Sequence, residues 1–299
     1  MTRGRRQLVV AAILTLAVGE GLAHLYLPRR QIDLYVEDSD PEIRWGFRPG
    51  SRMRFEGAIY KIPATDVAVN SRGFRTREWA DAAAPGAYRI LALGDSVTFG
   101  WGVEEAEAWP AQLERLLALE APYPVEALSL GVPGYDTAQE AALLDRWLDV
   151  LTPGAVVVQF SHNDVLPPDD SFGSLAAHRW LGYSGLYELG WWRWRVERSR
   201  RLAADPEEAM RRLHAGIAAC ALAFREMGDR LRSKGVAGVV LFKAGARDAT
   251  RPLMDEAREA GFRVANYADA WELAAATVSG GLEIPRDTHP NPAGHAVLA

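Results

Sequence analysis

The regular alternation of short apolar runs and longer amphipathic segments from Tyr88 to the C-terminus constrains the fold most strongly. Short apolar runs predict buried strands, and apolar residues repeating at helical spacing predict helices. The run 155–158 is apolar at every position, as expected of a parallel strand covered on both faces. The alternation therefore predicts a doubly wound α/β domain. The expected strands cover 89–93, 125–130, 155–160, 236–242 and 263–266, and the expected helices cover 106–119, 137–151, 206–233, 251–260 and 269–278.

The N-terminus has the layout of an export signal. Three arginines within the first six residues precede the apolar run 8–19. Extended to residue 27, the segment is long enough to cross a bilayer at about 1.5 Å per residue, with Glu20 and His24 near its outer end. We expect residues 1–30 to be a single-pass anchor in the inner membrane, with the rest of the chain outside the cytoplasm. A cleaved signal peptide, giving a secreted protein, and a buried N-terminal helix are the alternatives.

Composition limits the remaining possibilities. A net charge of −5 argues against a nucleic-acid partner, and the single cysteine, Cys220, excludes a disulfide within the chain. Residues 31–86 lack long helical periodicity and contain short strand-like pieces, so we expect a small β-rich or irregular extension there. The α/β domain then covers 87–299, with an insertion at about 165–205 that interrupts the alternation.

This insertion is rich in tryptophan, tyrosine and arginine. One interpretation is a helical cap whose aromatic side chains pack on the domain. The other is a lid or a membrane-surface patch, because Trp and Arg favour interfaces. An insertion after the third strand would lie at the rim where this architecture binds ligands.

Polar residues and glycines that suit nucleophilic catalysis follow several expected strands. Ser96 follows the first strand in a Gly-Asp-Ser turn and is the candidate nucleophile. His289, near the C-terminus, would accept its proton, and Asp287 would orient the imidazole. The N–H groups of Ser96 and Gly131 and the side-chain amide of Asn163 would stabilise the oxyanion. Because the carboxyl ends of parallel strands meet at one edge, we expect these segments to converge.

Each of these residues also has a structural interpretation. The Gly-Asp-Ser turn can cap a helix, and so can the Asn-Asp pair that ends at Asp164. His289 can cap the last helix, and His295, further along, is expected to be structural. His162 is a rival base, and His162 with Asp164 resembles half of a metal site, but no third ligand has a supporting spacing. We therefore expect no metal and no cofactor.

At these residues the chain resembles the SGNH hydrolases, also called the GDSL esterase/lipase family. The resemblance covers roughly residue 89 to the C-terminus. It implies a flavodoxin-like three-layer α/β/α fold with a mostly parallel five-stranded sheet, and hydrolysis of carboxylic esters through an acyl-enzyme without a metal. The matching blocks are 94–100, 130–134, 163–164 and 287–291.

Two positions depart from the family pattern. Ser161 stands where the third block usually has glycine, and Arg286 stands where the last block commonly has aspartate, so that Asp287 lies two residues before the histidine. The anchor and the segment 70–75 are similar to a bacterial, envelope-facing branch. The expected substrate is an acyl or acetyl ester on a small molecule, glycan or lipid. The alternatives are an O-acyltransferase acting on envelope polysaccharide and a non-catalytic binding module.

Overall fold

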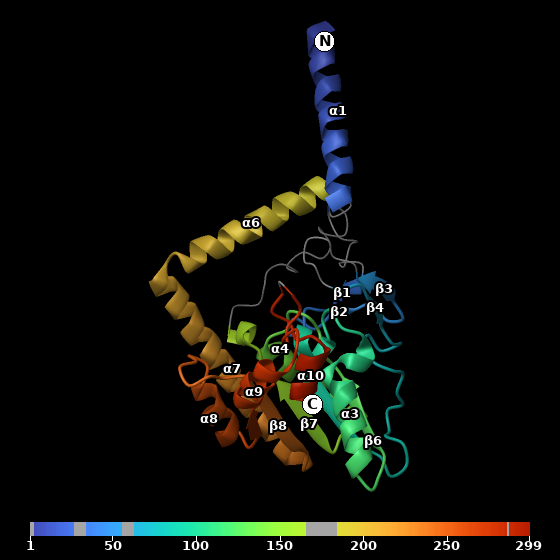
Figure 1. Cartoon of the computed structure of the whole chain (residues 1–299), viewed down its shortest axis with the longest axis vertical. Coiled ribbons are helices and arrows are strands. Elements are labelled where there is room, and N and C mark those ends of the chain that lie inside the picture. Colours follow the sequence, from blue (N-terminus) through green and yellow to red (C-terminus); the bar gives the residue numbers. More distant parts are fainter. Residues whose placement is uncertain (1–2, 27–33, 56–62, 166–183, 286) are drawn as a thin grey trace.

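The centre of the protein is a five-stranded sheet in which every neighbouring pair of strands is parallel. The structure, a computed structural model, describes residues 3–26, 34–55, 63–165, 184–285 and 287–299 (Figure 1). The strand order is β6-β5-β7-β8-β9, which is the flavodoxin-like order, with its switch point between β5 and β7. The strands are β5 (Tyr88–Gly94), β6 (Val125–Ser129), β7 (Ala155–Gln159), β8 (Ala237–Phe242) and β9 (Arg263–Asn266).

Alternate residues of β5, β6, β7 and β8 enter two separate hydrophobic cores, one on each face of the sheet. In β5, Leu91 and Leu93 lie in one core, and Ile90 and Ala92 lie in the other. The first core is covered by α4 (Thr137–Leu151), α7 (Pro206–Lys234) and α8 (Pro252–Glu259). The second core is covered by α3 (Trp109–Glu120), α9 (Ala268–Thr277) and α10 (Pro292–Leu298). The predicted three-layer α/β/α arrangement is thereby confirmed.

The predicted strands and long helices are all present, with ends shifted by at most a few residues. The helix expected from residue 106 begins at Trp109, because Pro110 favours the first turn of a helix and a short 3₁₀ turn, η2 (Glu105–Glu107), comes before it. Two short elements were not predicted, α2 (Ser96–Phe99) and η3 (His162–Val165). Both are too short to show helical periodicity in the sequence.

The N-terminal extension contains two antiparallel hairpins that pack on the α/β domain. Side chains from the first hairpin, Trp45 and Phe47 among them, belong to the same core as the sheet and α4. The Tyr135 hydroxyl donates to the carbonyl of Trp45, and the Gln139 side chain donates to the carbonyl of Ile43 at 2.8 Å. The strands are β1 (Tyr35–Glu37), β2 (Trp45–Phe47), β3 (Arg52–Phe55) and β4 (Thr65–Ala68).

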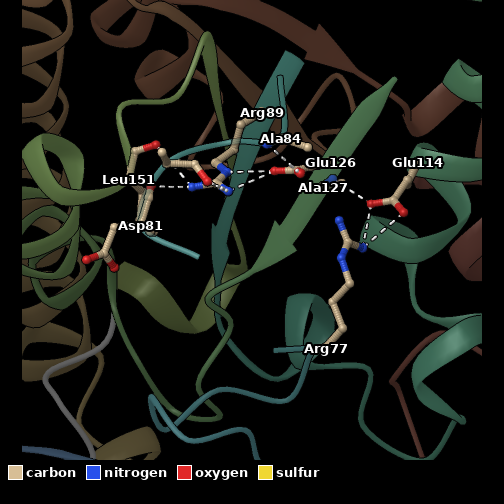
Figure 2. Close-up of polar contacts among 9 residues, drawn as sticks. Arg77, Asp81, Ala84, Arg89, Glu114, Glu126, Ala127 and Leu151 are labelled. Atoms are coloured by element: carbon tan, nitrogen blue, oxygen red, sulfur yellow. Dashed lines mark hydrogen bonds and ion pairs between the residues drawn. The ribbon is translucent and has the colours of Figure 1, made fainter. Parts of the chain in front are cut away.

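A buried ion pair fixes the segment that leads from the extension into the sheet. Figure 2 shows Arg89, at the start of β5, facing Glu126 of the neighbouring β6, with 2.8 Å between the Arg89 Nη2 and Glu126 Oε2 atoms. The guanidinium also donates to three carbonyls, so the connecting segment, β5 and the end of α4 share one buried cation. These carbonyls belong to Asp81, Ala82 and Leu151.

Two helices extend outside the α/β body. The first is α1 (Arg3–Tyr26), which extends away from the body, and its stretch Gly4–His24 is long and apolar enough to cross a membrane. The second is α6 (Gly185–Ala203), which runs from the C-terminal end of α1 to α7 (Figure 1). The first part of the predicted insertion, 166–183, and Arg286 lie outside the described residues.

Candidate active site

Ser96 lies at a sharp turn between β5 and α2. The Asp95 carboxylate caps α2 by accepting the N–H of Val97 at 2.9 Å. Gly94, the last residue of β5, has φ +154°, and a Cβ there would lie 2.0 Å from the Thr98 hydroxyl oxygen. Only glycine fits this position, because the turn needs both a positive φ and the close approach of Thr98. The turn places Ser96 at the carboxyl edge of the sheet, beside the switch point.

Ser96, His289 and Asp287 form a continuous chain of hydrogen bonds. The Ser96 hydroxyl lies 2.8 Å from the His289 Nε2 atom, although 193 positions separate the two residues. The other ring nitrogen, Nδ1, lies 2.5 Å from the Asp287 carboxylate, which also accepts the backbone N–H of His289 at 2.8 Å. Burial raises the pKa of Asp287, but the hydrogen bonds from His289 outweigh it and hold the pKa below its usual value. An ionised Asp287 favours the tautomer in which Nε2 is free to accept a proton.

The loop that carries His289 is held by backbone hydrogen bonds. The Ile284 N–H donates to the His289 carbonyl at 2.9 Å, and the Asn291 N–H donates to the Leu282 carbonyl at 2.9 Å. On the other side, the Trp101 ring lies against the imidazole, with 5.9 Å between the ring centres. These contacts restrict the imidazole to a position facing Ser96. Asn291, and not His289, caps α10, since its side chain accepts the Gly294 N–H at 3.0 Å.

The three expected oxyanion donors are available for a ligand. Among the described residues, the N–H groups of Ser96 and Gly131 have no hydrogen-bond acceptor, and the exposed Asn163 side chain has no partner. A Cβ at Gly131 would lie 2.4 Å from the Phe99 nitrogen of α2. The backbone at Gly131 therefore approaches the Ser96 helix as closely as only glycine allows.

Asp164 anchors the turn that presents Asn163. Its carboxylate accepts the Thr137 hydroxyl of α4 at 3.0 Å and the Ser161 N–H at 3.3 Å. Burial, reinforced by the nearby Asp95 carboxylate, raises the pKa of Asp164 well above its usual value. The pKa of the fully buried Glu140 is also raised well above its usual value. Burial is the larger cause, and the nearby Asp164 carboxylate is the second. Asp164 and Glu140 are thus neighbouring buried acids close to the candidate site, and their environment favours the protonated form of both carboxyl groups.

The other histidines of interest do not contact Ser96. His162 is exposed, and its Nε2 atom lies 2.6 Å from the Asp248 carboxylate. His295 is fully buried, and its Nδ1 atom accepts the Trp109 N–H at 3.2 Å. Within the parts of the chain that the structure describes, no cluster of three or more His, Cys, Asp or Glu residues could hold a metal ion.

Arg75 is a contributor that the sequence did not reveal. This buried side chain comes from the N-terminal extension and donates to the carbonyls of Phe99, Gly100 and Val103 at 3.2, 2.6 and 2.8 Å. It thereby braces the loop that follows α2 and contains Trp101. The similarity of the segment 70–75 to one branch of the family drew attention to this region, but nothing in the sequence indicated which arginine is buried.

A flavodoxin-like sheet carries at its carboxyl edge a serine that is hydrogen-bonded to a histidine–aspartate pair, an arrangement that suits ester hydrolysis. Residues 92–297 match the GDSL-like lipase/acylhydrolase family, and the chain belongs to this family. The resemblance noted in the sequence is thus confirmed, and the protein is an enzyme that acts on ester bonds.

The chain is also similar to solved structures. The crystal structure of TesA has 17% identity, covers 69% of this chain and 91% of that chain, and gives a TM-score of 0.46. A putative lipolytic protein of the G-D-S-L family from Desulfitobacterium hafniense DCB-2 has 14% identity and gives a TM-score of 0.45. The match covers 70% of this chain and 94% of that chain. A catalytic mutant of Axe2, an acetylxylan esterase from Geobacillus stearothermophilus, has 16% identity and gives a TM-score of 0.44. The match covers 71% of this chain and 90% of that chain. The comparison with curated proteins found no match.

Proposed function

We propose that the protein hydrolyses carboxylic esters through an acyl-enzyme formed on Ser96. His289 is the general base and then the general acid, and Asp287 holds the imidazole in the required tautomer. The N–H groups of Ser96 and Gly131, with the side-chain amide of Asn163, stabilise the oxyanion. The observation that carries this proposal is the unbroken contact from Asp287 through His289 to the Ser96 hydroxyl, at 2.5 and 2.8 Å.

The proposed reaction has two halves. The Ser96 oxygen attacks the ester carbonyl while its proton moves to His289 Nε2, and the resulting tetrahedral oxyanion collapses. The alcohol leaves with that proton, and the acyl group remains on Ser96. Water then attacks the acyl-enzyme while His289 takes its proton. As the second tetrahedral intermediate collapses, that proton passes to the Ser96 oxygen, and the carboxylic acid is released. No step requires a metal or an organic cofactor.

We propose that residues 1–30 anchor the enzyme in the inner membrane and that the body, residues 31–86 and 87–299, faces the envelope outside the cytoplasm. The apolar, largely exposed side chains of α1 and the arginines before its apolar run support this orientation. The proposed substrate is an acyl or acetyl ester carried by a small molecule, glycan or lipid.

The test compares two His–Asp pairs in the same protein. Ser96→Ala and His289→Ala should each lower kcat on 4-nitrophenyl acetate at least ~10³-fold, because the catalytic groups act as a unit. His162→Ala is the matched control, since His162 also pairs with an aspartate but does not contact Ser96; its kcat should stay within about twofold. A fluorophosphonate probe should label Ser96. A label on another residue, or full activity in Ser96→Ala, would exclude the proposed site.

A sugar acceptor separates hydrolysis from acyl transfer. Both reactions begin with the same acyl-enzyme, and they differ in whether water or a sugar hydroxyl attacks it. The proposal predicts free acid as the main product when an acetylated donor is incubated with an excess of oligosaccharide. Predominant acetylation of the oligosaccharide would identify an O-acyltransferase instead, and inactivity of the wild type on all esters would favour a binding module.

A further inference from the structure

We propose that α6 is a membrane-surface helix, docked at its first turn on the outer end of α1 and held against anionic phospholipid headgroups by its arginines and aromatic side chains. The proposal goes beyond the reaction at Ser96, and it rests on the part of the proposed function that keeps α1 in the membrane. It assigns a role to the Trp- and Arg-rich half of the insertion.

The first observation is a charged contact between the two helices. The Glu20 carboxylate of α1 accepts the N–H of Gly185 at 2.6 Å, the hydroxyl of Ser184 at 2.9 Å and the N–H of Leu186 at 3.2 Å. The first N–H groups of a helix have no partners within the helix, and a negative charge is favourable there. Glu20 therefore caps α6, which explains an acidic residue near the end of an otherwise apolar segment.

The second observation is the close fit of small residues at the same crossing. A Cβ at Gly185 would lie 2.7 Å from the Cβ of Ala23. A Cβ at Gly19 would lie 3.6 Å from the side chain of Leu186. Small residues let helix backbones approach closely at such crossings. Since α6 uses Glu20 and Ala23 as part of its own docking site, we infer that α1 is retained in the working protein.

The third observation is the composition of α6. Its 19 residues include five arginines and two glutamates, a net charge of +3. Tyr187, Trp191 and Trp194 follow one another at spacings of four and three residues, so they share one face of the helix. Trp194 is 55% exposed, and the Arg198 guanidinium lies 5.4 Å from the centre of its ring. Tryptophan and tyrosine favour the headgroup level of a bilayer, and clustered arginines favour anionic lipid.

The fourth observation is the direction of α6 in the molecule. Figure 1 shows α6 leaving the C-terminal end of α1 at an oblique angle and sloping toward α7, while the α/β body lies on the side away from α1. With α1 across a bilayer, α6 would begin at the surface of that bilayer and lie between the lipid and the body. Among the described elements, α6 packs mainly on α1 and α7. The side chains of Arg193, Trp194, Arg200 and Arg201 are exposed and can reach such a surface.

The experiment measures the depth of a probe in the full-length protein, reconstituted in vesicles that contain phosphatidylglycerol and phosphatidylcholine. In a Cys220→Ala background, an environment-sensitive fluorophore is placed at Trp194→Cys of α6. The matched control is Leu119→Cys, because Leu119 is 84% exposed at the end of α3 and belongs to the body. The collisional quencher is a lipid spin-labelled at its headgroup.

We expect quenching at position 194 to exceed quenching at position 119 at least threefold. Vesicles of phosphatidylcholine alone, or the combined substitutions Arg193→Gln, Arg198→Gln and Arg200→Gln, should reduce quenching at 194 at least twofold. Equal quenching at the two positions would overturn the proposal. Shielding of position 194 that persists in detergent would also overturn it, because a protein partner or a second copy would then cover α6.

The same samples separate this inference from the proposed function. Intact mass of the vesicle-bound protein reports whether α1 is retained, and hydrolysis of a soluble ester reports on Ser96. An active, intact, vesicle-bound enzyme without quenching at 194 would refute only the α6 proposal. Glu20→Gln removes the charge that caps α6, and it should lower quenching at 194 while ester hydrolysis stays within about twofold.

Discussion

At the scale of single residues, Arg75 connects the N-terminal extension to the loop beside the candidate nucleophile. Its planar guanidinium reaches carbonyls in several directions at once, including those of Gly100 and Val103 at 2.6 and 2.8 Å. A lysine ammonium is a compact charge and cannot present donors in the fixed planar arrangement of a guanidinium. Trp101, which lies against His289, belongs to the loop that the Arg75 guanidinium holds. Arg75 is therefore a positioning residue.

Replacing Arg75 tests this role. Arg75→Lys should lower kcat about 10- to 100-fold, because small displacements of catalytic groups are costly. It should also lower the free energy of unfolding by about 2 kcal/mol through lost buried hydrogen bonds. The measurements are steady-state kinetics and urea unfolding. The control is Arg77→Lys, which keeps an exposed pair with Glu114 and should change neither value appreciably. Unchanged kcat in a destabilised Arg75→Lys would leave Arg75 with a purely structural role.

His295 makes stability depend on pH. Burial, with the neighbouring His289 and Arg75, lowers its pKa to about 3, so it stays neutral in the folded protein. Unfolded, it takes up a proton below about pH 6.5, and the unfolded state then binds more protons than the folded state. This contribution is complete above that pH and is lost as the pH falls towards 3, by on the order of 5 kcal/mol in total.

A substitution that keeps the hydrogen bond isolates this effect. His295→Asn retains an acceptor for the Trp109 N–H but does not titrate. Between about pH 6.5 and pH 5, the free energy of unfolding of the variant should fall by about 2 kcal/mol less than that of the wild type. Urea unfolding at several pH values measures both. Parallel curves would show that His295 does not control this range.

Much of the candidate site was predictable at this scale, and the physical reasons are local. Ser96 was recognisable because a tight turn directly follows an apolar run, and Asp287 and His289 because they lie close together in a short block. Arg75 and Trp101 were not predicted as contributors, because their contacts join segments that are far apart along the chain. His289 was predicted as the base and His162 as its rival. It is His289 whose Nε2 atom lies 2.8 Å from the Ser96 hydroxyl, whereas His162 pairs with Asp248.

At the scale of secondary-structure elements, the Arg89–Glu126 pair joins β5 to β6 where both strands begin (Figure 2). The Arg89 side chain is 2% exposed and the Glu126 side chain 20%. Removing one member of a buried pair leaves the other without its partner, and this costs more than the pair itself contributes. The start of the sheet should therefore be sensitive to a change in either residue.

Arg89→Met should lower the free energy of unfolding by about 3 kcal/mol, because Glu126 and three backbone carbonyls lose their donor. Thermal and urea unfolding measure the change. The control is Arg54→Met in the exposed Arg54–Asp66 pair of β3 and β4, for which we expect less than about 1 kcal/mol. Similar losses in both variants would contradict the importance of burial.

Strands and helices with an apolar pattern of their own were predictable, and short helical turns were not. The strand over 263–266 and the helix over 137–151 have the predicted bounds, since each shows its own periodicity and has clear ends. In contrast, η3 depends on tertiary contacts, and a Cβ at Gly216 of α7 would lie 1.8 Å from the Val165 carbonyl oxygen. The contact of η3 with α7 joins segments that are far apart in the chain, so the local sequence pattern does not indicate it.

At the scale of the whole molecule, the extension and the α/β domain share one core. Phe47 of β2 is 3% exposed, and its ring centre lies 5.1 Å from that of Phe99 in α2, the helix that begins with Ser96. The predicted boundary at residues 86–87 separates two sequence patterns, but the packing crosses it. We therefore expect the two parts to unfold together.

Phe47→Ala tests this cooperativity. It should lower the free energy of unfolding by about 3 to 4 kcal/mol, because the side chain leaves a cavity in a shared core. Far-UV circular dichroism and tryptophan fluorescence should still report one coincident transition. Leu119→Ala, at an exposed site of α3, should change stability by less than about 0.5 kcal/mol. A separate early transition for the extension would refute a common core.

The direction in which the catalytic edge faces has a consequence for encounter with substrate. The loop between α9 and α10, which carries His289, lies at the end of the body nearest α1 (Figure 1). Once α1 is embedded, as we propose, the enzyme meets lipid-borne esters by lateral diffusion in two dimensions. Turnover of such esters would then follow their surface density, and diluting the vesicles in buffer would leave the rate per enzyme unchanged.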